Sequence, residues 1–194
     1  MHRNSQLIFT EHVLHLFQDG QYVLEVGPGK HTWYGEAVLR KCPNSKWHVA
    51  DPRDVKASHP HARAAVMPDE DTIPCGSEIF DVVFSAQVME HVSRPWRWVP
   101  ELARTLKKGG LLILVSPVTY AEHRAPRDCW RVLPQGGEVL LKDAGCEILR
   151  AEFMQLDDTG VDDHKGFNPG PLIDLLLIGK KIARGGAAGS SEGP

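Results

Sequence analysis

The sequence has no apolar run long enough to cross a bilayer, for which about 20 residues are needed. Its longest runs, Leu111–Val115 and Leu175–Ile178, have the length of a strand. The four cysteines form no C-x-x-C pair, which excludes the common zinc-ribbon and thioredoxin-like motifs. No long apolar segment lies near the first residues, so we expect no secretory signal peptide. These absences together predict a cytoplasmic protein with reduced thiols and no membrane contact.

An excess of positive charge is also missing. The chain has 22 basic and 25 acidic side chains, a formal net charge of −3. Proteins that bind nucleic acids are usually basic, so this balance disfavours a nucleic-acid partner. The sequence does not indicate the oligomeric state.

Length and composition predict a single domain. The chain has 194 residues, of which 42% are hydrophobic and 24% charged, as in ordinary soluble domains. We place the domain at residues 1–184, with an amphipathic N-terminal helix at 5–18 as a candidate lid. Residues 185–194 are small, polar and aperiodic, so we expect a disordered tail. This size leaves little room for a separate recognition domain, which favours a small-molecule substrate.

Hydrophobic periodicity alternates between strand-like and helix-like segments along the chain. Continuous apolar strands separated by helices predict an α/β fold, in which helices cover both faces of a mostly parallel, doubly wound sheet of seven strands. The last two strands follow each other without a helix, so we expect antiparallel pairing there. The strands are predicted at residues 22–26, 47–50, 64–67, 81–85, 111–115, 146–155 and 172–180, and the helices after the first at 33–41, 86–91, 96–107 and 137–143.

A glycine-containing turn follows the first strand, where ligands bind in open α/β sheets. Gly27 and Gly29 match the start of a dinucleotide fingerprint, but Thr32 stands where the third glycine would be, which disfavours NAD and an oxidoreductase. Asp51 ends the next strand, where a carboxylate can accept hydrogen bonds from a ribose diol. Glu25 would repel a diphosphate and would suit a positively charged ligand. A nucleoside with an ammonium and a sulfonium fits all four positions, and S-adenosylmethionine is such a ligand.

Four segments in this order resemble class I S-adenosylmethionine-dependent methyltransferases, and in particular the small, type 11-like members. They are Val23–Gly29, Asp69–Ser85, Ala86–Val92 and Leu106–Ile113. The resemblance covers about residues 20–180 and implies a Rossmann-like fold and an S-adenosylmethionine cofactor. It indicates almost nothing about the methyl acceptor.

The resemblance also implies a set of cofactor contacts. Glu25, Gly27 and Gly29 would line the methionine end. Asp51 would hold the ribose, and Pro52 or Arg53 would lie beside the adenine. Asp69, or its neighbours Glu70 and Asp71, would approach the amino group of the adenine. Ser85 and Ala86 would form the floor near the sulfonium. In this family Glu90-His91 is more often structural than catalytic.

The loop after the fifth predicted strand is the candidate acceptor site. It resembles the H-x-x-P-x-D-x-W-R stretch of a subset of these enzymes. We predict that His123 acts as general base because imidazole titrates near neutral pH, and that Asp128 orients it or acts itself. Arginines could hold an anionic acceptor. The candidate substrate-binding residues are Tyr120, Arg124, Arg127, Trp130 and Arg131.

The predicted function is therefore methyl transfer to the oxygen or nitrogen of a small acceptor, such as an anionic metabolite or a natural-product or sugar intermediate. No metal ligand set is expected, because the acidic cluster at residues 157–164 lacks EF-hand spacing. The alternative is a non-catalytic or regulatory protein that binds the same cofactor, since fold does not determine function.

Overall fold

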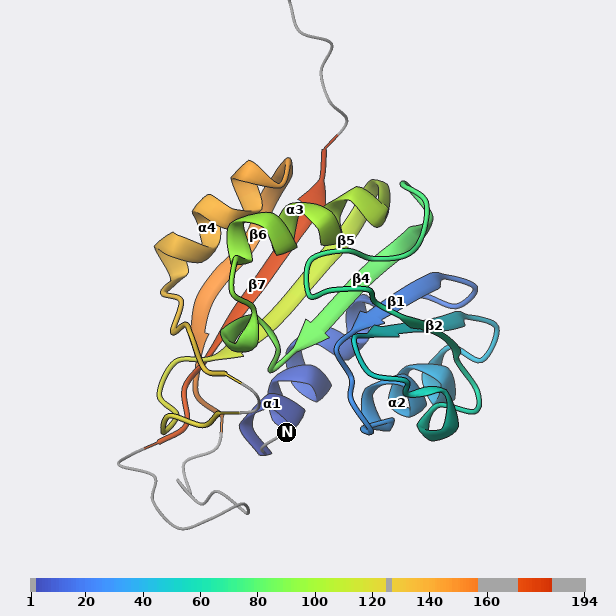
Figure 1. Cartoon of the computed structure of the whole chain (residues 1–194), viewed down its shortest axis with the longest axis horizontal. Helices are drawn as coiled ribbons and strands as arrows, with labels where there is room; N and C mark the ends of the chain where they lie inside the picture. Colours follow the sequence, from blue (N-terminus) through green and yellow to red (C-terminus); the bar gives the residue numbers. More distant parts are fainter. Residues whose placement is uncertain (1–2, 125–126, 157–170, 183–194) are drawn as a thin grey trace, which may run out of the picture.

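The computed structural model describes residues 3–124, 127–156 and 171–182, and these form a seven-stranded sheet with helices on both faces (Figure 1). The strand order is β3-β2-β1-β4-β5-β7-β6. The strands are β1 Tyr22–Val26, β2 Lys46–Asp51, β3 Arg63–Val66, β4 Phe80–Ala86, β5 Leu106–Pro117, β6 Cys146–Met154 and β7 Asp174–Lys181. The helices are α1 Arg3–Ile8, α2 Trp33–Lys41, α3 Pro95–Thr105 and α4 Pro134–Asp143.

The pairing of the strands confirms the predicted fold class. Strands β1 to β5 pair in parallel, and β1 lies between β2 and β4, with Val23 opposite both Trp47 and Val82. Strand β7 runs antiparallel to both of its neighbours, β5 and β6. The last strand in sequence is thus inserted beside β5, which leaves β6 at the sheet edge.

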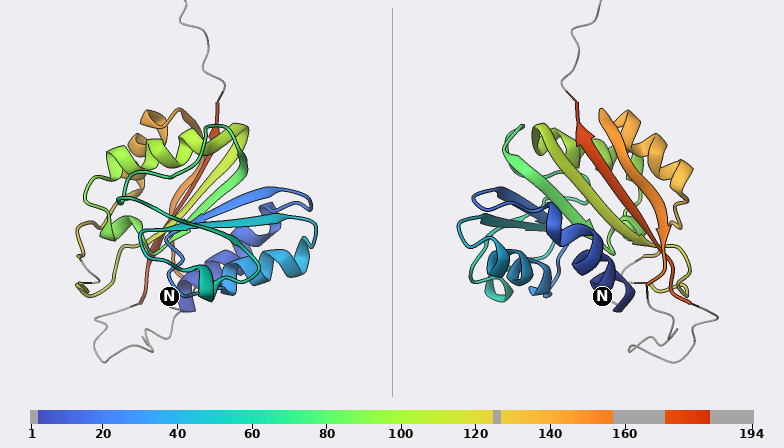
Figure 2. Two further views of the ribbon diagram at one scale, coloured as in Figure 1. Left: turned by 45° about the vertical axis from the view of Figure 1, so that its right-hand side comes forward. Right: turned by 180° about the vertical axis from the view of Figure 1, so that it is seen from behind.

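Each face of the sheet has its own apolar core. On one face, Trp98, Val99 and Leu102 of α3 and Leu141 of α4 are fully buried against the sheet. On the other face, Val38 of α2 packs with the N-terminal segment. The view from behind in Figure 2 shows that segment over the face opposite α3 and α4. The alternation of strand and helix in the sequence therefore corresponds to two packed layers around one sheet.

The N-terminal segment is helical but is not one regular α-helix. Helix α1 is followed by a π-helical turn at Phe9–Val13 and a 3-10 turn at Leu14–Leu16. Phe9, Val13 and Phe17 are almost completely buried, and Phe9 contacts the rings of Tyr34 and Phe84. The segment is thus part of the core in this structure, and its role as a lid stays a prediction.

Three predicted helices differ from the structure. The helix expected at 137–143 begins earlier, at Pro134, because proline is accommodated at the first position of a helix. The helix expected at 96–107 ends at Thr105, because Leu106 already pairs with Phe80 as the start of β5. The helix expected at 86–91 is only a 3-10 turn at Met89–His91. It follows Gln87, whose φ of 59° is outside the helical region and prevents a longer helix.

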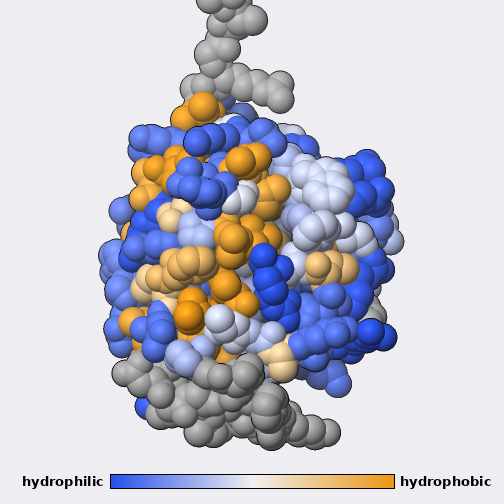
Figure 3. Space-filling model, turned by 90° about the vertical axis from the view of Figure 1, so that its left-hand side faces the viewer, coloured by the Kyte–Doolittle hydropathy of each residue, from blue (hydrophilic) through white to orange (hydrophobic). Residues whose placement is uncertain are grey.

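The far edge of the sheet presents apolar side chains to solvent. Val139 of α4 and Leu149 and Phe153 of β6 are about half exposed. Figure 3 shows this side of the molecule, where apolar side chains gather.

No helix in the described part of the chain is long and apolar enough to span a membrane. All four cysteines are free. The predicted tail at 185–194 and the acidic cluster at 157–164 both lie outside the described residues.

Two adjacent glycines of α4 should respond oppositely to alanine. A Cβ on Gly137 would lie 2.5 Å from Cδ2 of the buried Leu177, so we expect Gly137→Ala to lower the free energy of unfolding by about 1–3 kcal/mol. A Cβ on the exposed Gly136 would make only an ordinary contact of 3.4 Å with Val132. Gly136→Ala should therefore stabilise by roughly 0.5–1 kcal/mol through helix propensity. Urea unfolding measures both values, and equal effects would contradict the close packing of α4 on β7.

Candidate active site

A cleft of about 1470 Å³ opens at the carboxyl ends of β1, β2 and β4. In open α/β sheets this is where ligands bind, because the strand order reverses beside β1. The cleft brings together ten of the residues predicted from the sequence. Seven belong to the predicted cofactor set and three to the predicted acceptor loop: Glu25, Gly27, Gly29, Asp51, Pro52, Asp69 and Ala86, with Tyr120, His123 and Arg127.

The turn after β1 requires its two glycines. Gly27 has a φ of 75° and Gly29 a φ of 59°, values that residues with a side chain rarely adopt. A Cβ on Gly27 would also lie 2.6 Å from a methyl carbon of Val88. The amide of Gly27 donates to the carbonyl of Ala50, which joins the turn to β2. The turn therefore exposes backbone to the cleft, as close approach of a ligand requires.

Asp51 is fully buried at the end of β2 and has several hydrogen-bond donors. Its carboxylate accepts from the amide of Gly29 at 2.9 Å and from the guanidinium of Arg53 at 2.9 and 3.1 Å. Burial opposes ionisation of Asp51, but these donors lower its pKa below the ordinary value. The side chain of Arg53 is 72% exposed, so it can leave Asp51 at little cost in packing.

Glu25 is a second buried carboxyl group in the wall of the cleft. It is 2% exposed, and the indole nitrogen of Trp47 donates to it at 3.1 Å. Burial raises the pKa of Glu25 to about 8, despite this hydrogen bond. A cation that approached the carboxyl group from the cleft would stabilise its ionised form.

The remaining predicted cofactor residue lies behind the wall of the cleft. Ser85 is 2% exposed and donates to the carbonyl of Val26 at 2.7 Å, which ties β4 to β1. It does not line the cleft. Successive residues of a strand point to opposite faces, so only one of Ser85 and Ala86 can face the cleft. The sequence did not indicate which of the two does.

The acceptor loop is held by an ion pair at its centre. The carboxylate of Asp128 accepts two hydrogen bonds from Arg131, at 2.5 and 2.7 Å, and one from the amide of His123 at 2.9 Å. Although burial opposes this, these contacts lower the pKa of Asp128 to about 2. Nδ1 of His123 lies 3.4 Å from the same carboxylate. Asp128 thus orients His123 while it is bound to Arg131.

Four residues predicted to act on the acceptor lie beside the cleft or away from it. Asp128, Trp130 and Arg131 line a smaller adjoining pocket of about 300 Å³. The indole of Trp130 donates to the carbonyl of Val92 at 2.8 Å, and Arg131 also contacts the carbonyl of Tyr120. Arg124 is exposed and pairs with Glu122. These contacts hold the loop together, because Trp130 and Arg131 direct their polar groups to protein atoms.

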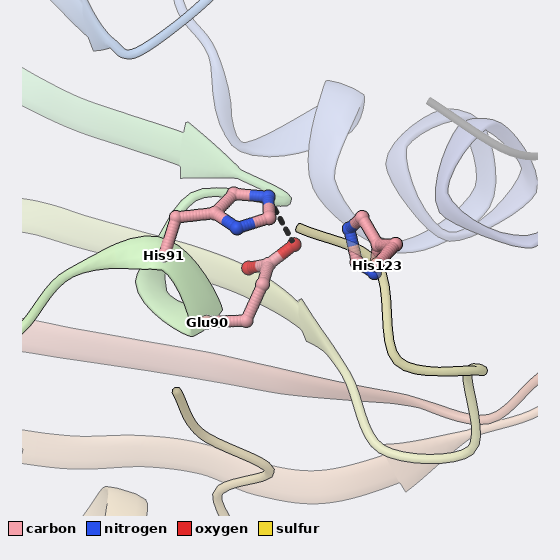
Figure 4. Close-up of side chains that lie close together, drawn as sticks. All are labelled: Glu90, His91 and His123. Atoms are coloured by element: carbon pink, nitrogen blue, oxygen red, sulfur yellow. Dashed lines mark ion pairs between the residues drawn. The ribbon is translucent and has the colours of Figure 1, made fainter. Parts of the chain in front are cut away.

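Glu90 and His91 line the cleft, and the family resemblance implied a structural role for them at the edge of the cofactor site. Glu90 is 1% exposed, and burial raises its pKa to about 8. The ring of His91 contacts that of His123, with centroids 4.9 Å apart. Figure 4 shows Glu90 and His91 on the turn after β4, with His123 reaching them from the acceptor loop. The Glu-His dipeptide was the one feature of the sequence that pointed to this arrangement. No feature of the sequence indicated that His123 would lie next to it.

Comparison with known proteins shows the family of this chain. A family model described as "Methyltransferase domain" matches residues 2–150. An uncharacterized methyltransferase of Mycolicibacterium vanbaalenii is 32% identical over 101 residues, which are 50% of this chain and 39% of that protein. A ubiquinone biosynthesis O-methyltransferase of Maricaulis maris is 36% identical over 88 residues, 45% of this chain and 32% of that one. The chain thus matches less than half the length of these relatives.

The fold has counterparts among solved structures. The putative methyltransferase in a complex with the Haloferax volcanii Trm112 methyltransferase activator superposes with a TM-score of 0.74 at 17% sequence identity, covering 94% of each chain. At that identity the likeness concerns the fold alone. The family model matches more than half of this chain, and its domain includes the glycine turn, Asp51 and the Glu90-His91 turn. The chain belongs to the class I S-adenosylmethionine-dependent methyltransferases.

Proposed function

We propose that this protein transfers the methyl group of S-adenosylmethionine to a small-molecule acceptor bound in the same cleft. The observation that carries this proposal is the placement of two buried carboxyl groups on either side of a glycine turn. Glu25 and Asp51 end neighbouring strands, and both line the cleft with Gly27 and Gly29. Family membership alone would leave open whether this chain has kept a working cofactor site.

The residues present fit this cofactor. Asp51 would accept hydrogen bonds from the ribose hydroxyls once Arg53 has moved aside, and Glu25 would face the ammonium group. Gly27 and Gly29 have no Cβ where the cofactor would meet the backbone. Pro52 and Asp69 line the cleft beyond Asp51, on the side proposed for the adenine, while Ala86 forms the floor. Ser85 supports this floor through its bond to β1.

The bound cofactor would supply an electrophilic methyl group on a sulfonium, so the chain must chiefly position the acceptor and promote loss of its proton. We assign that proton loss to His123, oriented by Asp128. Tyr120 and Arg127 line the cleft and would contact the acceptor. Trp130 and Arg131 line the adjoining pocket and would support this loop, while Arg124 is exposed outside both pockets. The arginines favour an anionic acceptor methylated on oxygen or nitrogen, and a cytoplasmic location stays a prediction.

Cofactor binding is the first prediction. At a hundred times its dissociation constant, S-adenosylmethionine should add about 2.7 kcal/mol to stability. For a chain of this length that should raise Tm by roughly 5–10 °C in a thermal melt. S-adenosylhomocysteine should act similarly and NAD should not. Asp51→Asn should abolish most of the shift, because it removes the charged acceptor for the ribose hydroxyls.

The matched control is Asp54→Asn, three residues further on, at an exposed aspartate that accepts only from the amide of Lys56 in this turn. It should keep the full shift. A wild-type protein that melts at the same temperature with and without both adenosyl compounds would overturn the proposed function. A shift without methylation of any acceptor would instead favour the non-catalytic alternative.

The buried acid Glu25 should make stability depend on pH. Its folded pKa of about 8 exceeds the unfolded value, so its stabilisation is complete below the unfolded pKa and is lost as pH rises toward 8. Glu25→Gln cannot titrate. The free energy of unfolding of the variant minus that of wild type should therefore increase by on the order of 3 kcal/mol between pH 5 and pH 8.5.

Urea unfolding at the two pH values measures this difference, and Glu138→Gln on the surface of α4 is the control. Parallel pH profiles for wild type and Glu25→Gln would mean that Glu25 is already ionised at pH 5. The same variant should also bind S-adenosylmethionine more weakly, because it lacks the carboxylate proposed to face the ammonium.

His123→Ala should lower turnover by about 100-fold or more, since it removes the group that promotes proton loss. The thermal shift with S-adenosylmethionine should change little, because His123 belongs to the acceptor loop. His61→Ala, at an exposed histidine outside the cleft, is the control. Unchanged turnover in His123→Ala would remove His123 from the reaction.

A further inference from the structure

Three metal-ligating side chains converge at the acceptor end of the cleft. One ligand atom each from Glu90, His91 and His123 lies within 4.8 Å of the others. Figure 4 shows the carboxylate of Glu90 directed into the space between the two imidazole rings. Within the described residues this is the group of His, Cys, Asp and Glu side chains that meets the geometry of an ion site. His123 is 32 residues beyond His91, so no local spacing in the sequence indicates the group.

Glu90 lacks the partners that a buried carboxyl group normally has. It is 1% exposed, and neither of its oxygens has a hydrogen-bond partner. Nε2 of His91 is 3.6 Å from Oε1, which is too far for a hydrogen bond. The nearby guanidinium of Arg131 is bound to Asp128. Burial of an unpartnered polar group is costly, and a cation between the carboxylate and the imidazoles would remove that cost.

Both imidazoles have protein acceptors at Nδ1. Nδ1 of His91 is hydrogen-bonded to the carbonyl of Arg127, which accepts and thus places a proton on Nδ1. Nδ1 of His123 is 3.4 Å from the carboxylate of Asp128 and 3.3 Å from the carbonyl of Ala121, both acceptors. In the neutral rings Nε2 is then the lone-pair nitrogen. Acceptors behind Nδ1 orient histidine ligands in this way at metal sites.

We propose that Glu90, His91 and His123 bind one divalent transition-metal ion, with Zn²⁺ as the expected occupant. Two imidazoles and one carboxylate match the ligand preference of zinc, whereas Mg²⁺ and Ca²⁺ prefer oxygen ligands throughout. Three protein ligands leave an open position on a tetrahedral ion, as at catalytic zinc sites. The side chains of His91 and His123 are 19% and 34% exposed, so an ion can enter from the cleft.

The inference rests on the proposed function for its consequence and deepens it. The open position would take an oxygen of the acceptor, which a bound cation makes more acidic. The O–H bond would then break with its electron pair left on oxygen, and the proton would pass to water in the open cleft. That electron pair would form the O–CH3 bond as the S–CH3 bond of the cofactor breaks and S-adenosylhomocysteine leaves. His123 would promote that loss as a ligand of the ion rather than as the base. The acceptor class is accordingly a hydroxyl compound.

The test is binding of Zn²⁺ to the full chain after treatment with a chelator, measured by competition with a chromophoric chelator. We expect one ion per chain, and no displacement by Mg²⁺ or Ca²⁺ in large excess. Glu90→Gln and His123→Ala each remove a proposed ligand. Each should lower the affinity for Zn²⁺ by at least the roughly 10–100-fold that follows loss of a residue hydrogen-bonded to a ligand. Asp128→Asn changes a residue that orients His123, so it should lower the affinity for Zn²⁺ by roughly 10–100-fold.

The controls are Glu122→Gln, at an exposed residue of the same loop, and His61→Ala. Both should bind Zn²⁺ as wild type does. Because Glu90→Gln alters a buried group, a thermal melt checks its fold, and His123→Ala on the partly exposed loop tests the site independently. Binding of Zn²⁺ that all these variants retain would place the ion elsewhere and overturn the inference, as would a wild-type protein that binds none.

The S-adenosylmethionine shift, measured on the same samples, separates the two proposals. A shift without Zn²⁺ binding would overturn the metal site and leave the proposed function standing. One equivalent of Zn²⁺ lost in Glu90→Gln, with no cofactor shift, would uphold the metal site and overturn the proposed function.

Discussion

The position of β1 between two parallel partners is the constraint on which the site depends. The chain leaves β1 toward β2 and β3 and later returns on the other side through β4 and β5. The connections after β1 and β4 therefore diverge to opposite sides of the sheet and leave a crevice above their carboxyl ends. The glycine turn, Asp51 and the Glu90-His91 turn reach the same cleft because each lies at or shortly after the carboxyl end of β1, β2 or β4. Residues far apart in sequence thus share one site through strand order alone.

Buried acidic groups gather at this crevice: Glu25, Asp51 and Glu90 line it, and Asp174 lies behind Gln87 of its wall. Glu25, Asp51, Glu90 and Asp174 are each at most 2% exposed. Their surroundings differ: Glu25 has an indole donor, Asp51 a guanidinium, and Asp174 the amide groups of Asn4 and Gln87, whereas both oxygens of Glu90 lack a hydrogen-bond partner. Buried carboxyl groups are costly unless they are paired or protonated. Their accumulation favours a positively charged ligand at the methionine end and a cation at the acceptor end.

Asp174 also connects the site to the rest of the fold. One of its oxygens accepts from Asn4 of α1 at 2.7 Å, and the other from Gln87 at 2.9 Å. Gln87 lies directly after β4 in the sparsely populated left-handed region and is part of the cleft wall. The insertion of β7 beside β5 brings Asp174 to this position. The N-terminal segment, β7 and the floor of the cleft are therefore held together by one buried acceptor.

What the sequence by itself determined is local. Tyr22–Val26 and Trp33–Lys41 have the predicted bounds, because hydrophobic period and flanking turn residues act over a few positions. The position of the glycine turn and Asp51 could also be predicted from the sequence. Residues at the carboxyl ends of adjacent parallel strands lie at the same edge of the sheet, independently of the side chains that pack around them. Only the tertiary structure decided the rest. It put Ser85 behind the wall of the cleft, where it bonds Val26, and it brought His123 to Glu90 and His91. Those outcomes depend on contacts between distant segments, and neither periodicity nor motif spacing encodes such contacts.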